Sequence, residues 1–410
     1  MRLLIVTQYF WPEEFRVNDL AMELSRRGHE ITVLSGLPNY PQGRVYAAFR
    51  SNPRDYERLG DVRIIRVPLI TRGKGGGIRL IANYLSFAVN ACLLGAWKLR
   101  GRKFDAIFAY EPSPVTVGIP AAFMRGLKNA PMALWVLDLW PETLSALGVV
   151  RAPSMLAAVG RLVSAIYDRS DLILAQSRSF VPQIEARCTR PTRRVEYFPS
   201  WAESIFDSSG ESDAGELPEK DGKFDIMFAG NIGDAQDFPA ILAAAARLKG
   251  HPRIRWLIVG DGRAADWVSR EIARCGLQGE VLMLGRHPTA RMPAFYRRAD
   301  ALLVTLKDEP IFAMTIPGKL QTYLIAGVPI LGMLNGEGAR VIEAAGAGLA
   351  CGAGDDEALS QAVLAMAAMT LEERQSMGAR GRAYGRAEFG REALMDRLED
   401  RLTNLAKLPS

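Results

Sequence analysis

Lys319 lies in the stretch whose residue types most clearly suggest chemistry, EPIFAMTIPGKLQTYLIAGVPIL, from Glu309 to Leu331. An apolar run that reads as a strand precedes this stretch, and Pro317 and Gly318 introduce a segment of helix length. Proline is favourable in a first helical turn because it has no N–H to leave unsatisfied. The free amides of that turn, together with the helix dipole, attract anions, and Lys319 adds a full positive charge. A loop, a helix start and a lysine after a strand therefore predict a site for nucleotide phosphates.

Other polar residues stand where predicted parallel strands end, which is where α/β proteins bind ligands. In the front half, Asp138 ends the run ALWVLDLWPE, and Glu111 and Ser113 lie in YEPSP. For Asp138 we weigh a ligand role and a cap of the next turn equally, and for Ser113 we favour the cap. In the back half, Asn231 and Gly233 follow FDIMFAG, where glycines would let the backbone approach a phosphate closely.

These residues need sheets to position them, and the chain supplies two sets of apolar runs separated by helix-length segments. The front half contains LLIVTQ, EITVLSG, RIIRVPL, FDAIFAY, ALWVLDL and DLILAQ, and the back half contains FDIMFAG, IRWLIVG, VLMLG, ALLVTL and PILGML. Near-continuous Val, Ile and Leu strands indicate parallel sheets covered by helices on both faces. We therefore predict an α/β protein with two Rossmann-like domains, residues 1–200 and 201–385. The polar stretch Trp201–Lys223 forms the junction, and a last helix lies at about Arg391–Leu405.

Composition and the first residues argue against several classes of protein. Four scattered cysteines argue against a disulfide framework or a zinc site, and three dispersed histidines do not suggest a metal cluster. No signal-peptide pattern precedes the first strand. The first strand is followed by QYFWPEEFR in place of GxGxxG, which argues against an NAD enzyme.

Charge differs between the two halves. Residues 1–200 carry 27 Lys and Arg against 16 Asp and Glu, whereas residues 201–410 carry 24 against 29. The basic front half suits an anionic membrane or a phosphorylated acceptor. Nucleic acid is disfavoured because the basic residues are spread out and no recognition motif is present. An Arg-rich surface that only confers solubility is the alternative.

The segment Leu80–Trp97 has eighteen residues without a charge, close to the length that spans a bilayer. Asn83, Ser86 and Asn90 form a polar stripe on it, and basic residues flank both ends. We favour a helix buried against its sheet over an interfacial membrane helix, and both over a spanning one.

In their order along the chain, several motifs carry a resemblance that covers nearly the whole sequence. They are TQYFWPEEFRVNDLA, RRGHEITVLSGLPNYPQG, DLWPETL, FAGNIGDAQDF, GDG, PGKLQTYLIAGVPIL and NGEGA. The chain resembles bacterial family 4 glycosyltransferases of the GT-B fold, in particular fucosamine-type transferases of O-antigen and capsule synthesis. The resemblance implies two Rossmann-like domains with parallel sheets facing across a cleft. The front domain would take the acceptor, the back domain a nucleotide sugar, and a C-terminal helix (386–410) would cross back to the front domain.

The sequence departs from that family at several positions. Relatives carry two glutamates eight residues apart, and the matching positions here are Thr322 and Met314. Glu309 or Glu337 would then supply a displaced carboxylate, and Thr322 one hydrogen bond. Where relatives place Arg and Lys after the first back-domain strand, this chain has GNIGDAQ, and the frequent His before Asp138 is Leu137. Lys319 would therefore carry more of the diphosphate charge.

These arguments give one set of expected site residues. We expect catalytic roles for Lys319, Asp138 and Glu309; donor contacts from Gly230, Asn231, Gly233, Arg263, Arg286, Ala313, Met314, Thr315, Thr322 and Glu337; and acceptor-side roles for Arg16, Asn18, Glu111, Ser113 and Glu142.

The reaction that the resemblance implies is a retaining transfer of an N-acetylated amino or deoxy sugar, without metal or other cofactor. The donor would be a nucleotide sugar, UDP-linked by expectation, and the acceptor a polyprenyl diphosphate-linked or free oligosaccharide. We expect a cytoplasmic protein, peripheral on the inner face of the cytoplasmic membrane. A nucleotide-sugar epimerase or hydrolase of the same fold and a non-catalytic sugar-nucleotide-binding scaffold remain as alternatives.

Overall fold

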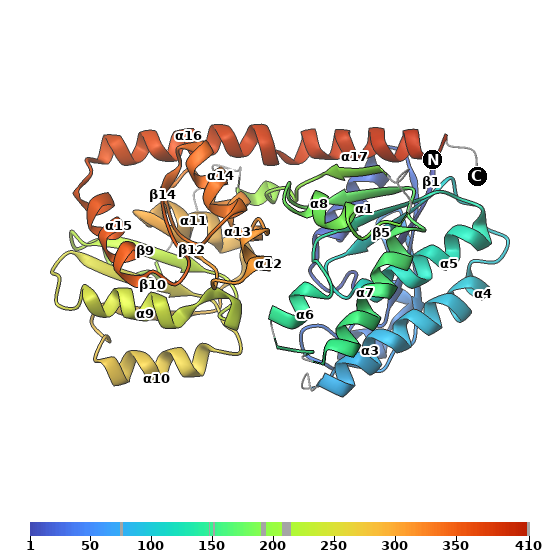
Figure 1. Cartoon of the computed structure of the whole chain (residues 1–410), viewed down its shortest axis with the longest axis horizontal. Helices are drawn as coiled ribbons and strands as arrows, with labels where there is room; N and C mark the ends of the chain where they lie inside the picture. Colours follow the sequence, from blue (N-terminus) through green and yellow to red (C-terminus); the bar gives the residue numbers. More distant parts are fainter. Residues whose placement is uncertain (74–76, 147, 151, 190–193, 207–214, 408–410) are drawn as a thin grey trace. The chain divides into compact units, whose positions relative to one another are not determined.

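The computed structural model of the protein describes residues 1–73, 77–146, 148–150, 152–189, 194–206 and 215–407. The chain divides into two compact units (Figure 1). Unit 1 comprises Met1–Phe198 together with Leu394–Ser410, and unit 2 comprises Pro199–Ala393.

Unit 1 is built on an eight-stranded sheet in which every neighbouring pair is parallel except β3–β4. In spatial order the strands are β3 (Arg58–Leu59), β4 (Val62–Val67), β2 (Glu30–Gly36), β1 (Arg2–Val6), β5 (Ala106–Glu111), β6 (Met132–Val136), β7 (Leu172–Ala175) and β8 (Arg194–Tyr197). Strands β5 and β6 are buried along their whole length, as expected for a parallel sheet covered on both faces. The covering helices are α1 (Arg16–Arg26), α3 (Gly77–Asn90), α4 (Ala96–Lys98), α5 (Gly118–Lys128), α7 (Pro153–Tyr167) and α8 (Phe180–Glu185), with the short α2 (Ala47–Ser51) and α6 (Glu142–Ala146).

Unit 2 is built on a six-stranded parallel sheet. Its spatial order is β11 (Val281–Gly285), β10 (Ile254–Val259), β9 (Phe224–Ala229), β12 (Ala301–Thr305), β13 (Ile330–Met333) and β14 (Gly348–Cys351). The chain leaves β9 toward β10 on one side and later returns to β12 on the other, so β9 marks the point where strand order reverses. Ligands of open α/β sheets bind at such a point. The helices are α9 (Phe238–Arg247), α10 (Ala265–Cys275), α11 (Met292–Arg298), α12 (Pro310–Ala313), α13 (Gly318–Ala326), α14 (Glu337–Ala345), α15 (Asp356–Ala368) and α16 (Leu371–Phe389).

The prediction of two α/β parts with parallel sheets is confirmed, and each of the eleven apolar runs forms a strand. The strands β3, β8 and β14 were not predicted. The predicted last helix is confirmed as α17 (Arg391–Leu405), most of which belongs to unit 1. It buries Leu394, Leu398, Leu402 and Leu405, which recur at helical spacing along one stripe.

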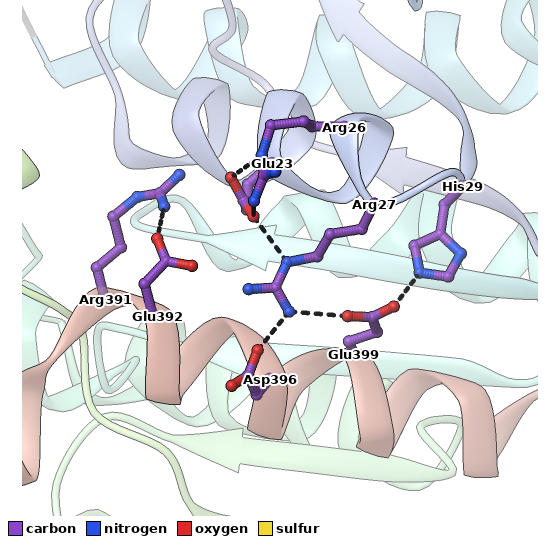
Figure 2. A network of polar contacts seen from close by, with 8 residues as sticks. All are labelled: Glu23, Arg26, Arg27, His29, Arg391, Glu392, Asp396 and Glu399. Atoms are coloured by element: carbon purple, nitrogen blue, oxygen red, sulfur yellow. Dashed lines mark hydrogen bonds and ion pairs between the residues drawn. The ribbon is translucent and has the colours of Figure 1, made fainter.

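A polar network joins α17 to the end of α1 and the turn after it (Figure 2). The Arg27 guanidinium donates to Glu23 at 2.7 Å, to Asp396 at 2.6 Å and to Glu399 at 2.8 Å. His29 Nε2 lies 2.8 Å from the second oxygen of Glu399. The guanidinium of Arg27 lowers the pKa of Glu399. Because Arg27 is only 14% exposed, its three carboxylate partners compensate a charge largely removed from water.

The segment Gly77–Lys98 is continuously helical, with α3 and α4 joined by a π-helical turn, Ala91–Gly95. Its polar stripe faces the protein. Asn83 donates to the Ile70 carbonyl at 2.6 Å and accepts from Gln8 Nε2 at 2.7 Å. Ser86 Oγ accepts from the Ile70 amide at 2.9 Å, and Asn90 donates to the Pro68 carbonyl at 2.9 Å.

The apolar side of this helix faces outward. Its exposed large hydrophobic residues are Ile78, Ile81, Leu85, Val89, Leu93, Leu94 and Trp97. Among the described residues it is the one helix long and apolar enough to cross a membrane, and only 28% of its most apolar window is buried. The interpretation as a helix buried against its sheet is therefore wrong for this side. The polar groups satisfy the backbone of residues 68–70 beside the buried Phe87, and the other large apolar side chains named above are left outside.

Candidate functional site

Lys319 is the first candidate residue of unit 2, because its buried Nζ has no hydrogen-bond partner among the described residues. It lies in the first turn of α13, as predicted, and its Nζ is 3.6 Å from the centroid of the Phe228 ring. The Nζ atom is buried and has no hydrogen-bond partner in the described part of the chain. Burial lowers the pKa of Lys319 to about 7. The ring face offers a cation–π contact but no counter-charge.

Two glycine loops close over this lysine. The Gly230 amide donates to the Val259 carbonyl, and the Ile232 amide donates to the Asp261 carbonyl at 2.9 Å. Gly260 has φ +143°, and a Cβ there would lie 1.8 Å from the Gly230 carbonyl oxygen, so no other residue fits. A Cβ on Gly230 would reach 3.4 Å from Lys319 Nζ. The loops after β9 and β10 therefore need their glycines to pack together above Lys319.

The remaining predicted donor residues of these loops are more exposed. Asn231 is exposed beside Gly233, which immediately precedes a 3-10 turn (Asp234–Gln236). Arg263 and Arg286 are exposed, on the segments that follow β10 and β11. All of them lie at the carboxyl ends of neighbouring strands, at the same edge of the sheet as Lys319.

The segment after β12 supplies the second part of the site in unit 2. Glu309 immediately precedes α12, Ala313 ends this helix, and Met314 and Thr315 follow it; all three of these later residues are half-buried. Gly336 packs directly on this segment, since a Cβ there would lie 2.0 Å from the Ala313 carbonyl oxygen.

Two of the predicted donor residues lie deeper. Glu337, at the first turn of α14, is buried and lies 2.8 Å from an Arg340 nitrogen. Thr322 is buried within α13. Glu309 is thus the more accessible of the two acids considered as substitutes for the missing pair.

In unit 1, Asp138 and Glu111 lie at the ends of the neighbouring strands β6 and β5. Thr143 and Ser113 hydrogen-bond to the Asp138 carboxyl, while burial raises the pKa of Asp138. Glu111 is fully buried, and neither carboxyl oxygen has a partner among the described residues. Burial, and then the nearby charge of Asp138, raise the pKa of Glu111 well above its ordinary value. The pair therefore favours one charged and one protonated carboxyl.

The other predicted acceptor-side residues differ in how many contacts their side chains make within the protein. Arg16 is the first residue of α1. Asn18 accepts from the Trp11 amide at 3.0 Å and donates to the Glu13 carbonyl at 2.6 Å, which holds the loop after β1. Glu142 forms an ion pair with Arg187.

Sequence reasoning missed Glu13. Its carboxylate accepts from the backbone amides of Phe10 at 3.2 Å, Asn39 at 2.8 Å and Tyr40 at 2.7 Å. It thereby ties the loop after β1 to the loop after β2. Burial raises the pKa of Glu13 to about 7, although these three hydrogen bonds oppose the rise. An acid in QYFWPEEFR, close behind the first strand, was the available signal.

The residues thus form two groups, each at the carboxyl edge of its own sheet. The predicted donor-side residues all lie in unit 2, and the predicted acceptor-side residues all lie in unit 1. Within the described ranges, no three His, Cys, Asp or Glu side chains are grouped so as to hold a metal ion.

Two doubly wound α/β units, one with a buried lysine under glycine loops, define the class of GT-B glycosyltransferases. Family models agree: residues 14–201 match the glycosyl transferase 4-like domain, and residues 210–384 match the glycosyl transferases group 1. The chain belongs to these glycosyltransferase families.

Individual relatives are distant. The chain is 29% identical over 274 residues to the probable glycosyltransferase WbjE of Pseudomonas aeruginosa, covering 64% of this chain and 66% of that protein. It is 26% identical over 317 residues to WcaI of Escherichia coli (strain K12), named for colanic acid biosynthesis, covering 74% and 75%. Among solved structures, Anabaena HepE in complex with UDP and glucose matches with a TM-score of 0.69 at 13% identity, covering 98% of this chain and 99% of that one. At that identity the match supports the fold.

Proposed function

We propose that the protein transfers a sugar, with retention of configuration, from a UDP-linked donor to a lipid-linked or saccharide acceptor in cell-surface polysaccharide synthesis. The sugar is an N-acetylated amino or deoxy sugar. The names of WbjE and WcaI support the reaction class and the pathway type, and the UDP in HepE supports the donor.

The observation that carries the proposal is the buried, unpartnered ammonium of Lys319. When the sugar C1–O bond breaks, negative charge builds on the leaving diphosphate. Lys319 and the amides of Asn231 and Gly233 are fixed donors, which lower the barrier without reorganising during the reaction. Because Lys319 has no carboxylate partner in the described part of the chain, its charge is available to the phosphate.

On the acceptor side we propose same-face attack, in which the departing phosphate takes the proton of the acceptor hydroxyl. Asp138 then orients the acceptor or the sugar and forms no covalent intermediate. Its hydrogen bonds from Thr143 and Ser113 hold the carboxyl in one orientation. Glu309 remains the proposed partner for the sugar hydroxyls.

The experiment is to incubate the purified protein with a panel of nucleotide sugars and a polyprenyl diphosphate-linked acceptor. Glycosylated acceptor with retained configuration supports the proposal. Isomerised donor would indicate an epimerase, free sugar a hydrolase, and binding without turnover a scaffold. A rate that EDTA abolishes would contradict the proposed metal-independent reaction.

We further propose that unit 1 binds the cytoplasmic face of the membrane through the outward apolar side of Gly77–Lys98. Apolar side chains such as Leu85, Leu93 and Trp97 would enter the interface, and the flanking basic residues would attract anionic lipid. The basic residues are Arg72, Arg79, Lys98, Arg100, Arg102 and Lys103, with Lys74 outside the described residues.

Flotation with anionic vesicles tests this binding mode. We expect vesicle binding at low salt, with release at raised salt because ions screen the attraction. Leu85→Ser with Leu93→Ser should weaken vesicle binding and leave donor binding unchanged. Leu371→Ser, at a 62% exposed apolar position of unit 2, is the matched control. Release that requires detergent would indicate insertion, and absence of binding would indicate a soluble acceptor.

A further inference from the structure

A basic recess of about 510 Å³ lies along strands β3 and β4 at one edge of the unit 1 sheet, away from Asp138. Its lining includes Phe49, Tyr56, Arg58, Arg63, Arg66 and Lys98. We propose that this recess binds the diphosphate of a lipid-linked acceptor. The inference rests on the proposed transfer to such an acceptor and names the group by which unit 1 would recognise it.

The charge of the recess is strongly positive and only weakly compensated. Its lining contains four cations and one carboxylate, that of Glu57. Neither Arg63 nor Lys98 has an ion pair with a described residue. Arg58 donates to the Asp61 carbonyl at 3.0 Å and lies 4.0 Å from the Asp61 carboxylate, whose side chain is 98% exposed. Such a contact contributes little.

Arg66 gives the recess a fixed cation. It donates to the Gly36 carbonyl at 2.8 Å and to the Trp11 carbonyl, and its buried Nε has no partner among the described residues. The guanidinium carbon lies 5.4 Å from the centre of the Phe49 ring, within the range of a cation–π contact. Burial lowers the pKa of Arg66 to about 10, so it remains charged at neutral pH.

The chemistry of the lining favours phosphate over a sugar carboxylate. Guanidinium forks match phosphate oxygens in bidentate geometry. A diphosphate also brings more than one negative charge to a recess with four cations, whereas a uronate brings one. The volume lies within the ordinary range for small-ligand sites, about 300–1,000 Å³.

The position of the recess points to a lipid-linked molecule. Lys98, whose Nζ donates to the Arg66 carbonyl at 2.9 Å, is the last residue of the helix with the outward apolar side. Trp97 and Leu93 on that helix are 61% and 65% exposed. A lipid-linked glycan carries its diphosphate between hydrocarbon and sugar, and here a cationic recess adjoins an apolar surface. Through the Trp11 carbonyl, Arg66 also contacts the loop after β1 at the acceptor side.

The test compares two double variants that remove the same charge. Arg58→Gln with Arg63→Gln empties the recess of two cations, whereas Arg50→Gln with Arg54→Gln removes two exposed arginines just outside its lining. Affinities are measured calorimetrically for inorganic pyrophosphate, for farnesyl diphosphate and for glucuronate. We expect the recess variant to bind both diphosphates at least tenfold more weakly and the control variant to stay within twofold of wild type. In the transfer assay, KM for the lipid-linked acceptor should rise while donor affinity is unchanged.

Several results would overturn the inference. Equal losses of diphosphate affinity in both double variants would mean that the overall positive charge of the surface, and not the recess, attracts the anion. Glucuronate that binds more tightly than pyrophosphate would indicate an acidic sugar, and lost binding to phosphatidylglycerol vesicles with unchanged pyrophosphate affinity would indicate a phospholipid headgroup. Recess-dependent diphosphate binding without any sugar transfer would refute the proposed function alone. Transfer with an unchanged acceptor KM in the recess variant would refute the recess alone.

Discussion

Replacing Lys319 by Met should make the protein more stable and less active. Burial lowers the pKa of Lys319 from 10.5 to about 7. At about 1.36 kcal/mol per pH unit, this disfavours the charged folded form by about 5 kcal/mol. The unfolded chain binds the proton more tightly, so the wild-type free energy of unfolding should rise as pH rises from 7 to 10.5. Below pH 7 the full cost of the buried charge applies. There the free energy of unfolding of Lys319→Met should exceed that of wild type by up to about 5 kcal/mol, less whatever the folded protein recovers by relaxing around the charge.

The same group should make donor binding take up a proton. A nucleotide sugar keeps both phosphates ionised from pH 6 to 8, so its own titration does not intervene. If the diphosphate restores the charge on Lys319, binding should take up about 0.1 proton at pH 6 and about 0.9 at pH 8. The dissociation constant should rise about tenfold per pH unit above 7. No charged side chain accounts for the lowered pKa, whose one cause is burial.

Calorimetry in buffers of different ionisation enthalpy measures this uptake directly, and urea unfolding at pH 6 and pH 9 measures the stability. Lys319→Arg is the matched control, because a guanidinium stays charged and should bind donor without proton uptake. Turnover of Lys319→Met should fall by on the order of 10²-fold or more. Equal proton uptake by wild type and Lys319→Met at pH 8 would refute the reasoning, as would a variant no more stable than wild type at pH 6.

Three further substitutions test residues that stabilise the two units. Because the pKa of Glu13 is raised, the folded state binds this proton more tightly than the unfolded chain, and the wild-type free energy of unfolding should fall as pH rises from 4.5 to about 7. In Glu13→Gln this fall should be absent, which denaturant titrations across the pH range measure. Asp225→Ala should destabilise unit 2 by about 3–5 kcal/mol, because Arg255, 5% exposed and 2.7 Å from Asp225, would lose its main partner; urea unfolding measures this, and an unchanged midpoint would contradict it. Arg27→Ala should speed amide hydrogen exchange in α17 and leave exchange in α13 unchanged. A variant whose α17 amides exchange as slowly as those of wild type would show that the network does not stabilise α17.

The fold was largely predictable because buried parallel strands carry a strong pattern. The apolar runs are long, and turn residues separate them, so their number and type follow from composition along the chain. Strand β3 escaped because two residues, Arg58 and Leu59, carry no pattern at all. Strand β8, Arg194–Tyr197, is half-polar, and β14 is short. Edge strands of this kind are defined by their neighbours and not by their own residues.

The placement of the candidate residues in the fold was predictable where backbone position decides it. Lys319, Gly230 and Asn231 follow directly from strand ends and a helix start. Glu13 and Arg66 could not be predicted in this way. Their contacts reach Asn39, Tyr40 and Gly36, which lie in loops that follow other strands. Hydrogen bonds across loops leave no periodic trace in sequence.

The helix Gly77–Lys98 shows a second limit of sequence reasoning. Its pattern establishes that one side is polar, but either side of an amphipathic helix can face the protein. Here the carbonyl of Ile70 needs a donor, and Asn83 supplies it. The side that carries Asn83 also buries Phe87 and Ala88, so the inward side combines polar contacts to a neighbouring segment with apolar packing.

Buried cations separate structural from ligand-binding roles in this protein. Arg255 and Arg27 are both largely removed from water, and each is held by carboxylates at 2.6–2.8 Å. Lys319 Nζ and Arg66 Nε are buried nitrogens without a partner among the described residues, and the nearby charge of Glu13 compensates Arg66 only in part. A buried cation without a counter-ion destabilises the fold, so an anion bound from solution would recover what the protein does not supply itself. Lys319 lies at the strand ends of unit 2 and Arg66 beside the apolar helix of unit 1, which are the positions where the two phosphate-bearing substrates of the proposed reaction would each bring their charge.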